Sequence, residues 1–208
     1  DANGNSFLPN FMLYFFGISS MGRTLYGDIA FVSHTWTLAT EQLFYLLWPL
    51  VLIYCRKRLL VAMLLIILLY HVTSYFLVTK YAYVIPYNRY IFSFLSGVYI
   101  QCMALGSIFA LVLNRKMKLL NILHHPITFY ASLVASVLLS FVFKSFTIYH
   151  YDLYSVLFGI IILNLASNPK YSNVLENKVT NYLGTISYGM YMYHPIIIFI
   201  AIKVALSF

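Results

Sequence analysis

Apolar residues are gathered in long runs, and short polar stretches separate one run from the next. A transmembrane helix needs roughly 20 apolar residues to cross the hydrocarbon core of a bilayer. Runs of about this length cover residues 36–54, 59–79, 90–113, 126–143, 151–166 and 182–204. The pattern therefore predicts an all-α fold, a polytopic transmembrane helical bundle of about six spans.

The remaining stretches are too short or too polar to span. Residues 7–18 are apolar and aromatic, but Pro9 and Gly17 interrupt them, which predicts a short re-entrant or interfacial segment or the end of a lost helix. Residues 19–33 predict a loop, and residues 167–181 a polar surface loop. With no internal repeat and no soluble domain in the pattern, residues 1–208 are interpreted as one membrane domain.

Composition supports the membrane assignment. Hydrophobic residues make up 62% of the chain and charged residues 9%, whereas soluble domains carry about 25% charged residues. The net charge of +8 does not indicate nucleic acid, because the basic residues stand in short clusters between apolar runs and act as topology signals. Cys55 and Cys102 predict neither a disulfide framework nor a metal site.

The distribution of Lys and Arg predicts an orientation. One set of loops contains Arg56, Lys57, Arg58, Arg115, Lys116, Lys118, Lys170 and Lys178, and the other set of positions contains Arg23, Lys80, Arg89, Lys144 and Lys203. Cytoplasmic loops are the richer in Lys and Arg, so we assign the first set to the cytoplasm. The amino-terminal end of the 36–54 helix then lies on the extracytoplasmic side.

That end carries candidate chemistry, in the stretch from His34 to Pro49. Glu41 lies in an apolar run, and because a carboxylate is costly in lipid, it is expected to face protein or water. On one helix, His34 and Glu41 would lie on the same face, about 10 Å apart along the axis. Glu41 could act as a base, orient a histidine, or make a structural contact between helices. His34 could donate to an acyl carbonyl, relay a proton, or cap the helix.

The same stretch resembles the signature of the membrane acyltransferase 3 family, approximately H-x-W-S-L-x-x-E-x-x-F-Y-x-x-x-P. Thr37 replaces the usual serine, and Gln42 stands where many members carry a second glutamate. Residues 88–97 resemble the family's arginine followed by a phenylalanine–glycine helix, and residues 183–196 resemble its last core helix. The matching residues of the first motif are His34, Trp36, Leu38, Glu41, Phe44, Tyr45 and Pro49.

The resemblance implies an integral membrane enzyme of the bacterial inner membrane. Such proteins move an acyl group, usually acetyl, from acyl-coenzyme A to a hydroxyl of a cell-envelope glycan or lipid-linked saccharide. The implied partners are the bilayer, the glycan and acetyl-coenzyme A as donor, with no tightly bound cofactor and no nucleic acid. Family members have about ten spans, an essential histidine in the first span and an arginine-rich cytoplasmic motif. Neither motif is present, so we expect residues 1–208 to be a C-terminal portion of the domain. The alternatives are a glycan transporter or exporter, and an inactive truncated relic.

Six residues are the candidates for the site. The catalytic candidates are Glu41 and His34, and the substrate-binding candidates are Arg89, Trp36, Tyr45 and His194. Trp36 could stack on a sugar, although it and Tyr45 could equally pack or anchor at the membrane interface. Arg89 could pair with Glu41, contact an anionic glycan or anchor the helix. His194 could line a cavity, or bond to the backbone carbonyl that Pro195 leaves free one turn earlier.

Other charged residues have simpler interpretations. Asp152 and Glu176 are predicted to be solvated charges. The clusters at residues 56–58 and 115–118 could attract the phosphates of coenzyme A, but their roles in topology and in binding lipid headgroups explain them sufficiently.

Overall fold

A computed structural model describes residues 7–16, 19–27, 29, 33–79, 87–142, 148–171, 173 and 175–206. Within these ranges every regular element is a helix, which confirms the predicted all-α class. The elements are α1 (Phe7–Phe15), α2 (Ser19–Tyr26), the 3-10 turn η1 (Ser33–Thr35), α3 (Trp36–Tyr54), the 3-10 turn η2 (Arg56–Arg58), α4 (Leu59–Val78), α5 (Asn88–Val98), α6 (Ile100–Asn114), α7 (Leu119–Leu123), α8 (Pro126–Val142), α9 (Ile148–Ser167) and α10 (Lys178–Ala205).

The predicted apolar runs all form helices. In the described part of the chain, five helical stretches are long and apolar enough to cross a membrane: Trp36–Tyr54, Arg56–Val78, Tyr90–Asn114, Tyr149–Ser167 and Lys178–Ala205. The sixth, α8, is apolar and has 17 residues, slightly short of a full span. The chain is therefore a multi-pass membrane protein by the length and composition of its helices.

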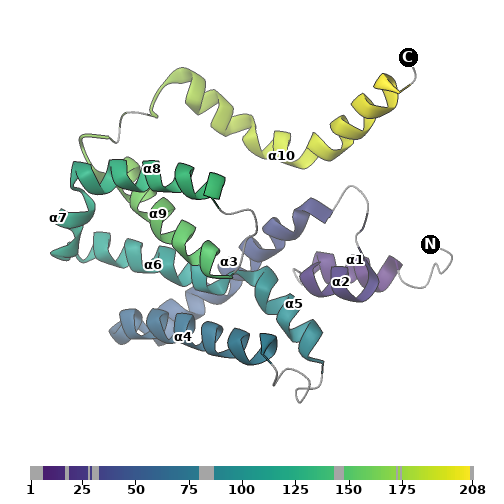
Figure 1. Cartoon of the computed structure of the whole chain (residues 1–208), viewed down its shortest axis with the longest axis horizontal. Helices are drawn as coiled ribbons and strands as arrows, with labels where there is room; N and C mark the ends of the chain where they lie inside the picture. Colours follow the sequence, from purple (N-terminus) through teal and green to yellow (C-terminus); the bar gives the residue numbers. More distant parts are fainter. Residues whose placement is uncertain are drawn as a thin grey trace.

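The loop predicted for residues 19–33 is wrong over its first part, where α2 forms. This helix lies against α1 (Figure 1), and Gly22 allows the close approach. A Cβ atom at Gly22 would lie 2.6 Å from Oδ1 of Asn10, inside contact distance. Asn10 also donates from Nδ2 to the carbonyl of Gly27 at 3.0 Å. The contact with α1 therefore stabilises α2 as a helix, although its sequence is too polar to predict one. Asp28, Lys80 and Lys144 lie outside the described residues.

The span predicted for residues 90–113 is broken at Tyr99, where α5 ends and α6 begins. Tyr99 has φ +51° and ψ +35°, the left-handed region that side chains other than glycine rarely adopt. Its ring lies between those of Trp36, at 5.5 Å, and Tyr151, at 4.8 Å between centroids. These contacts hold the unusual backbone in place, because nothing local favours it.

The interior of the bundle lies between α4, α6, α9 and α8, which neighbour one another in that order (Figure 1). Three groups of buried side chains fill it: Trp48, Met63 and Ala104 between α3, α4 and α6; Val112, Leu123, Ile160 and Leu163 between α6, α7 and α9; and Phe129, Ile161 and Tyr171 beside α8. None of the side chains of α10 is buried by the described chain.

One end of the bundle holds the basic clusters. The six apolar helices run in alternating directions, so η2, the end of α6, the start of α8, the end of α9 and the start of α10 share the left side of Figure 1. Two buried asparagines secure this end. Asn164 donates to the carbonyl of Leu123 at 2.8 Å, and Asn168 donates to the carbonyl of His124 at 3.1 Å and to Oδ1 of Asn164 at 2.9 Å.

Candidate active site

His34 is placed at the opposite end, directly before α3. It lies in the turn η1, so it does not share one continuous helix with Glu41 as predicted. Its ring stands edge-on to two rings of α10, those of Tyr191 at 5.2 Å and His194 at 5.0 Å between centroids. The fold thus brings together the first and the third of the motifs that resemble the acyltransferase family.

A short chain of hydroxyl groups joins α10 to the start of α3. The Tyr191 hydroxyl donates to the backbone carbonyl of His34. Its oxygen lies 2.5 Å from Oγ1 of Thr37. Because the single phenolic proton goes to the carbonyl, we assign Thr37 as the donor to Tyr191. The threonine that replaces the family's serine therefore keeps the hydroxyl that this contact uses.

His194 takes up the backbone carbonyl left free by Pro195. Proline has no N–H, so the carbonyl of Tyr191, four residues earlier, has no helical donor. Nδ1 of His194 lies 2.5 Å from this oxygen, the hydrogen bond expected from the sequence. A bond to a carbonyl requires a proton on Nδ1, which leaves Nε2 as the lone-pair nitrogen of the neutral ring. The substrate-binding role of His194 stays a prediction.

Glu41 belongs to a neighbouring site on α3. Its carboxylate is exposed and accepts a hydrogen bond of 2.9 Å from the hydroxyl of Tyr45, one turn further on. Glu41 lines a hollow of about 470 Å³ between α3 and α6, whose walls are Thr37, Thr40, Glu41, Phe44, Met103, Gly106, Ser107 and Ala110. Thr37 lines this hollow and also bonds to Tyr191, so it connects the two sites.

The other two candidates are placed less directly at the site. Trp36 packs inward against Tyr99 at an interplanar angle of 41°, so its ring is engaged by the protein. Arg89 is the second residue of α5, and its side chain lies outside what the structure describes. Its proposed contacts with Glu41 or with an anionic glycan stay predictions.

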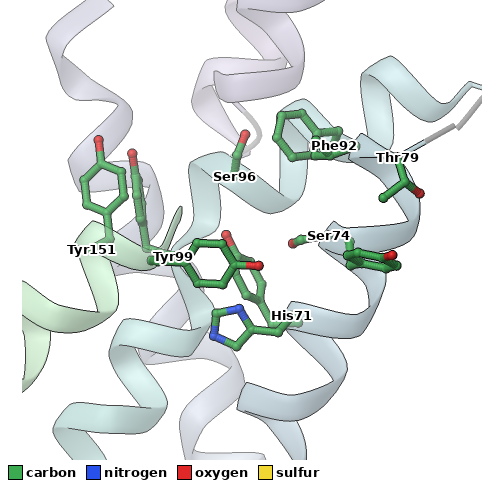
Figure 2. A pocket seen from close by; sticks show the side chains of 11 residues that line it. His71, Ser74, Thr79, Phe92, Ser96, Tyr99 and Tyr151 are labelled. Carbon is green, nitrogen blue, oxygen red and sulfur yellow. The ribbon is translucent and has the colours of Figure 1, made fainter. Parts of the chain in front are cut away.

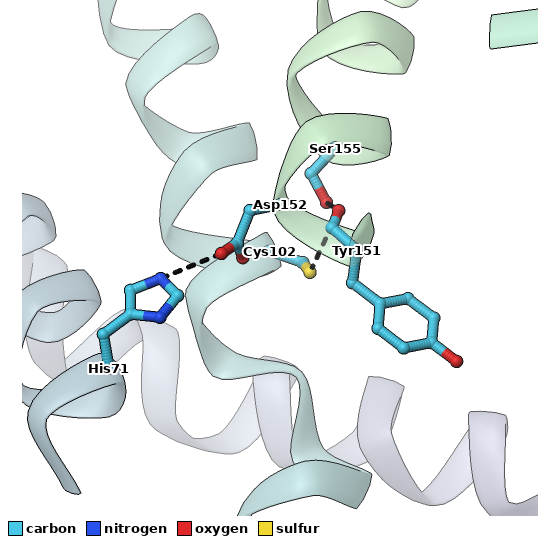
Figure 3. A network of polar contacts seen from close by, with 5 residues as sticks. All are labelled: His71, Cys102, Tyr151, Asp152 and Ser155. Atoms are coloured by element: carbon cyan, nitrogen blue, oxygen red, sulfur yellow. Dashed lines mark hydrogen bonds and ion pairs between the residues drawn. The ribbon is translucent and has the colours of Figure 1, made fainter. Parts of the chain in front are cut away.

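Sequence reasoning missed a pair of ionisable groups. Asp152 is not a solvated charge as predicted, because its Oδ2 lies 2.8 Å from Nε2 of His71 on α4 (Figure 3). The side chains of His71 and Asp152 are 27% and 20% exposed, respectively. A usable signal was present, since each residue lies in an apolar run and ionisable residues within membrane spans are functional candidates.

A basic surface at the other end is the candidate for binding an anionic donor. Arg56, Lys57 and Arg58 are exposed and border a hollow of about 560 Å³ beside the ends of α3 and α4. Such a cluster suits phosphate groups, which guanidinium and ammonium groups bind through charge-assisted hydrogen bonds. Among the described residues no three His, Cys, Asp or Glu side chains are gathered as metal ligands would be.

Comparison with known proteins identifies the family. A family model described as an acyltransferase domain, acyltransferase 3, matches residues 5–208. No curated protein and no solved structure gives a significant match. The family match covers nearly the whole chain, including all the motifs that the fold brings together. The chain therefore belongs to the acyltransferase 3 family of membrane acyltransferases.

Proposed function

We propose that the chain belongs to an inner-membrane O-acyltransferase. It transfers an acyl group, acetyl in the first place, from acyl-coenzyme A to a hydroxyl of a cell-envelope glycan or lipid-linked saccharide. The observation that supports this most directly is the contact of His34 with Tyr191 and His194. His34 is 157 positions from Tyr191 in the sequence. Together with the family match, this convergence supports the proposal that the reaction takes place at this end of the bundle.

The reaction needs a base for the acceptor hydroxyl and a donor for the developing oxyanion. The hydroxyl oxygen attacks the thioester carbonyl, its proton passes to the base, the C–O bond forms, the C–S bond breaks, and the thiol takes up a proton. Two groups suit the part of base. Glu41 lies in an open hollow, and in the neutral His194 ring the lone pair is on Nε2, because Nδ1–H donates to a carbonyl. The ring of His34 stands beside His194 and can supply a donor.

The basic cluster at residues 56–58 and the His34 turn lie at opposite ends of α3. With 19 residues, α3 spans about 28 Å. If the cluster binds the phosphates of the donor in the cytoplasm, the acyl group has to be carried along the bundle to reach the acceptor. The opening beside Glu41 between α3 and α6 is a path for that transfer.

The proposal is tested by replacing Glu41 in the full-length protein. Glu41→Gln and Glu41→Ala are each expected to lower kcat for acetyl transfer by about 100-fold or more, the usual loss when a general base is removed. The measurement is the incorporation of radiolabelled acetyl from acetyl-coenzyme A into envelope glycan by membranes containing the protein.

Glu176→Gln is the matched control, because Glu176 is exposed in the polar stretch before α10. Correct insertion of each variant is checked by its level in the membrane fraction. Full activity of Glu41→Ala would remove the role proposed for Glu41. If the unmodified protein exported glycan without consuming acetyl-coenzyme A, the proposed acyltransferase activity would be contradicted.

A further inference from the structure

A second cavity opens at the same end of the bundle as His34. It has a volume of about 540 Å³ and lies between α4, α5 and α9, within the range of sites for small molecules. Figure 2 shows His71 and Ser74 of α4 on one wall together with Thr79, which directly follows α4, Phe92 and Ser96 of α5 on another wall, and Tyr99 and Tyr151 closing the cavity. Tyr70, Tyr75, Val78 and Tyr149 complete the lining.

The chemistry of the lining selects against two kinds of ligand. Among the described residues that line the cavity there is no Lys or Arg, so none of them offers an anionic group a counter-charge. A plain hydrocarbon chain would leave several hydroxyl groups and an imidazole without partners. Aromatic faces that alternate with hydroxyl groups suit a ligand with both apolar faces and hydroxyl edges, as a neutral sugar ring has.

The His71–Asp152 pair gives the cavity a fixed polar group. Oδ2 of Asp152 holds Nε2 of His71, and the His71 ring is stacked on Tyr149 at 5.7 Å with an interplanar angle of 5°. If the Nε2–H donates to the carboxylate, Nδ1 is left as a hydrogen-bond acceptor. A carboxylate that orients an imidazole in this way sets both its tautomer and its direction.

Two buried oxygens, one on Asp152 itself and one on the nearby Ser74, can accept a further hydrogen bond. Oγ of Ser74 and Oδ1 of Asp152 are buried and make no well-formed hydrogen bond to another described residue. Gln101, which is fully buried, lies against Asp152 and Tyr70. Of these groups, Ser74 lines the cavity, and its hydroxyl is placed where a polar ligand could bond to it.

We propose that this cavity binds a neutral sugar ring of the acceptor glycan, with Nδ1 of His71 accepting a hydrogen bond from one of its hydroxyls. The proposal rests on the proposed function for the identity of the ligand as an acceptor. The cavity is connected to the His34 site through the rings of Tyr99 and Trp36, which pack against each other. A sugar bound here would be separated from the His34 turn by the rings of Tyr99 and Trp36.

Binding is tested without any activity by cysteine protection in the full-length protein. Thr79 lies at the rim of the cavity, and Thr79→Cys is labelled from outside with a membrane-impermeant maleimide. A neutral sugar is expected to slow the labelling about tenfold at ten times its dissociation constant, because occupancy leaves about one cavity in eleven open. The probes are N-acetylglucosamine, galactose and rhamnose, each compared with glucuronate and with a dodecyl detergent.

Tyr87→Cys is the matched control, because Tyr87 is 76% exposed at the same end and does not line the cavity. Protection of Thr79→Cys but not of Tyr87→Cys by a neutral sugar supports the proposal. Protection by the detergent alone would show a site for a lipid chain, and protection by glucuronate alone a site for an anion. Either result, or no protection at all, overturns the proposal.

Kinetics separate the cavity from the acyl-transfer step. His71→Gln and Asp152→Asn are expected to raise KM for the acceptor about tenfold, the value of one lost hydrogen bond to an oriented group, with a smaller change in the KM for acetyl-coenzyme A. His125→Gln is the control, because His125 is exposed at the far end of the bundle. Ser96→Trp fills the cavity without touching the pair and is expected to have the same effect.

The outcomes distinguish the two proposals. Sugar protection without acetyl transfer by the unmodified protein would contradict the proposed function and leave the cavity as a sugar site. If all three variants transferred acetyl groups with an unchanged KM for the acceptor, the proposed sugar site would be contradicted. The proposed acyltransferase function would be unaffected.

Discussion

The hydroxyl groups of Thr37 and Tyr191 fix the position of α10 against the start of α3. Tyr191 is the residue of α10 that bonds to the start of α3, through the carbonyl of His34 and the hydroxyl of Thr37. Thr37 also lines the hollow that contains Glu41. Removing either hydroxyl would make the position of the His34 ring relative to the His194 ring less fixed, although neither histidine is changed.

Tyr191→Phe is expected to destabilise the protein by about 2 kcal/mol, because it loses the hydrogen bonds to His34 and to Thr37, and Thr37→Val by about 1 kcal/mol, because it loses the bond to Tyr191. Thr37→Ser, which restores the residue usual in the family, is expected to change stability little. The two losses share one contact, so the double variant is expected to cost less than their sum. Apparent Tm in detergent, measured by retention of soluble protein, checks this, and additive effects would contradict the shared contact.

At the residue scale, the sequence allowed one contact to be predicted and hid another. The bond of His194 to the carbonyl freed by Pro195 follows from neighbours in one helix, so a local rule was enough. The pairing of His71 with Asp152 depends on α4 meeting α9, which no local pattern specifies. The apolar runs around both residues marked them as candidates without showing that they were partners.

Among the elements, α10 is the one whose shape depends most on a single residue. Figure 1 shows it bent midway along its length, where Pro195 interrupts the helical hydrogen bonds. The bend and the side-chain bond of His194 are two effects of the same missing N–H group. Through them, Pro195 sets the direction in which His194 faces His34.

Pro195→Ala is expected to restore the backbone hydrogen bond to the carbonyl of Tyr191, release His194 and straighten α10. Because an interior proline costs a helix about 3 kcal/mol relative to alanine, the variant is expected to be no less stable, while acetyl transfer falls at least tenfold. Spin labels at residues 178 and 204 would report a longer end-to-end distance by pulsed electron resonance. Ile196→Ala is the control, and an unchanged distance with unchanged activity would contradict the role of Pro195.

The bounds of most helices could be predicted because apolar runs end where charges begin. The predicted 36–54 span coincides with α3, whose end is followed by Arg56–Arg58. The break at Tyr99 could not be predicted, because its cause is the packing of aromatic rings from α3 and α9. The helix α2 was missed for a similar reason, since its contact with α1 rather than its own apolarity stabilises it.

On the scale of the whole molecule, the alternating helices separate two ends of different character. The basic clusters and the buried Asn164–Asn168 pair lie at one end, and the His34 site and the sugar-sized cavity lie at the other. This separation matches an enzyme that takes its donor from one side of a membrane and its acceptor from the other.

Labelling from the two sides of the membrane checks the predicted orientation. Single cysteines at residues 118 and 170 are expected to react with an impermeant maleimide only after the cells are permeabilised, and cysteines at 87 and 206 in intact cells, because the positive-inside rule places the basic end in the cytoplasm. The chain without added cysteines gives the background. The reverse pattern would turn the whole assignment around and place Glu41 and His34 in the cytoplasm.

The left-handed backbone at Tyr99 has a consequence for how this protein can change over time. Its φ of +51° suits glycine, whereas its place between Trp36 and Tyr151 suits an aromatic ring. Glycine would meet the first demand and lose the second, whereas another aromatic residue would keep the second and leave the first unmet. Selection for robustness alone would draw this position towards glycine, at the expense of the wall that the cavity shares with the His34 site. Tyr99 therefore combines an unfavourable backbone conformation with a ring that closes the cavity.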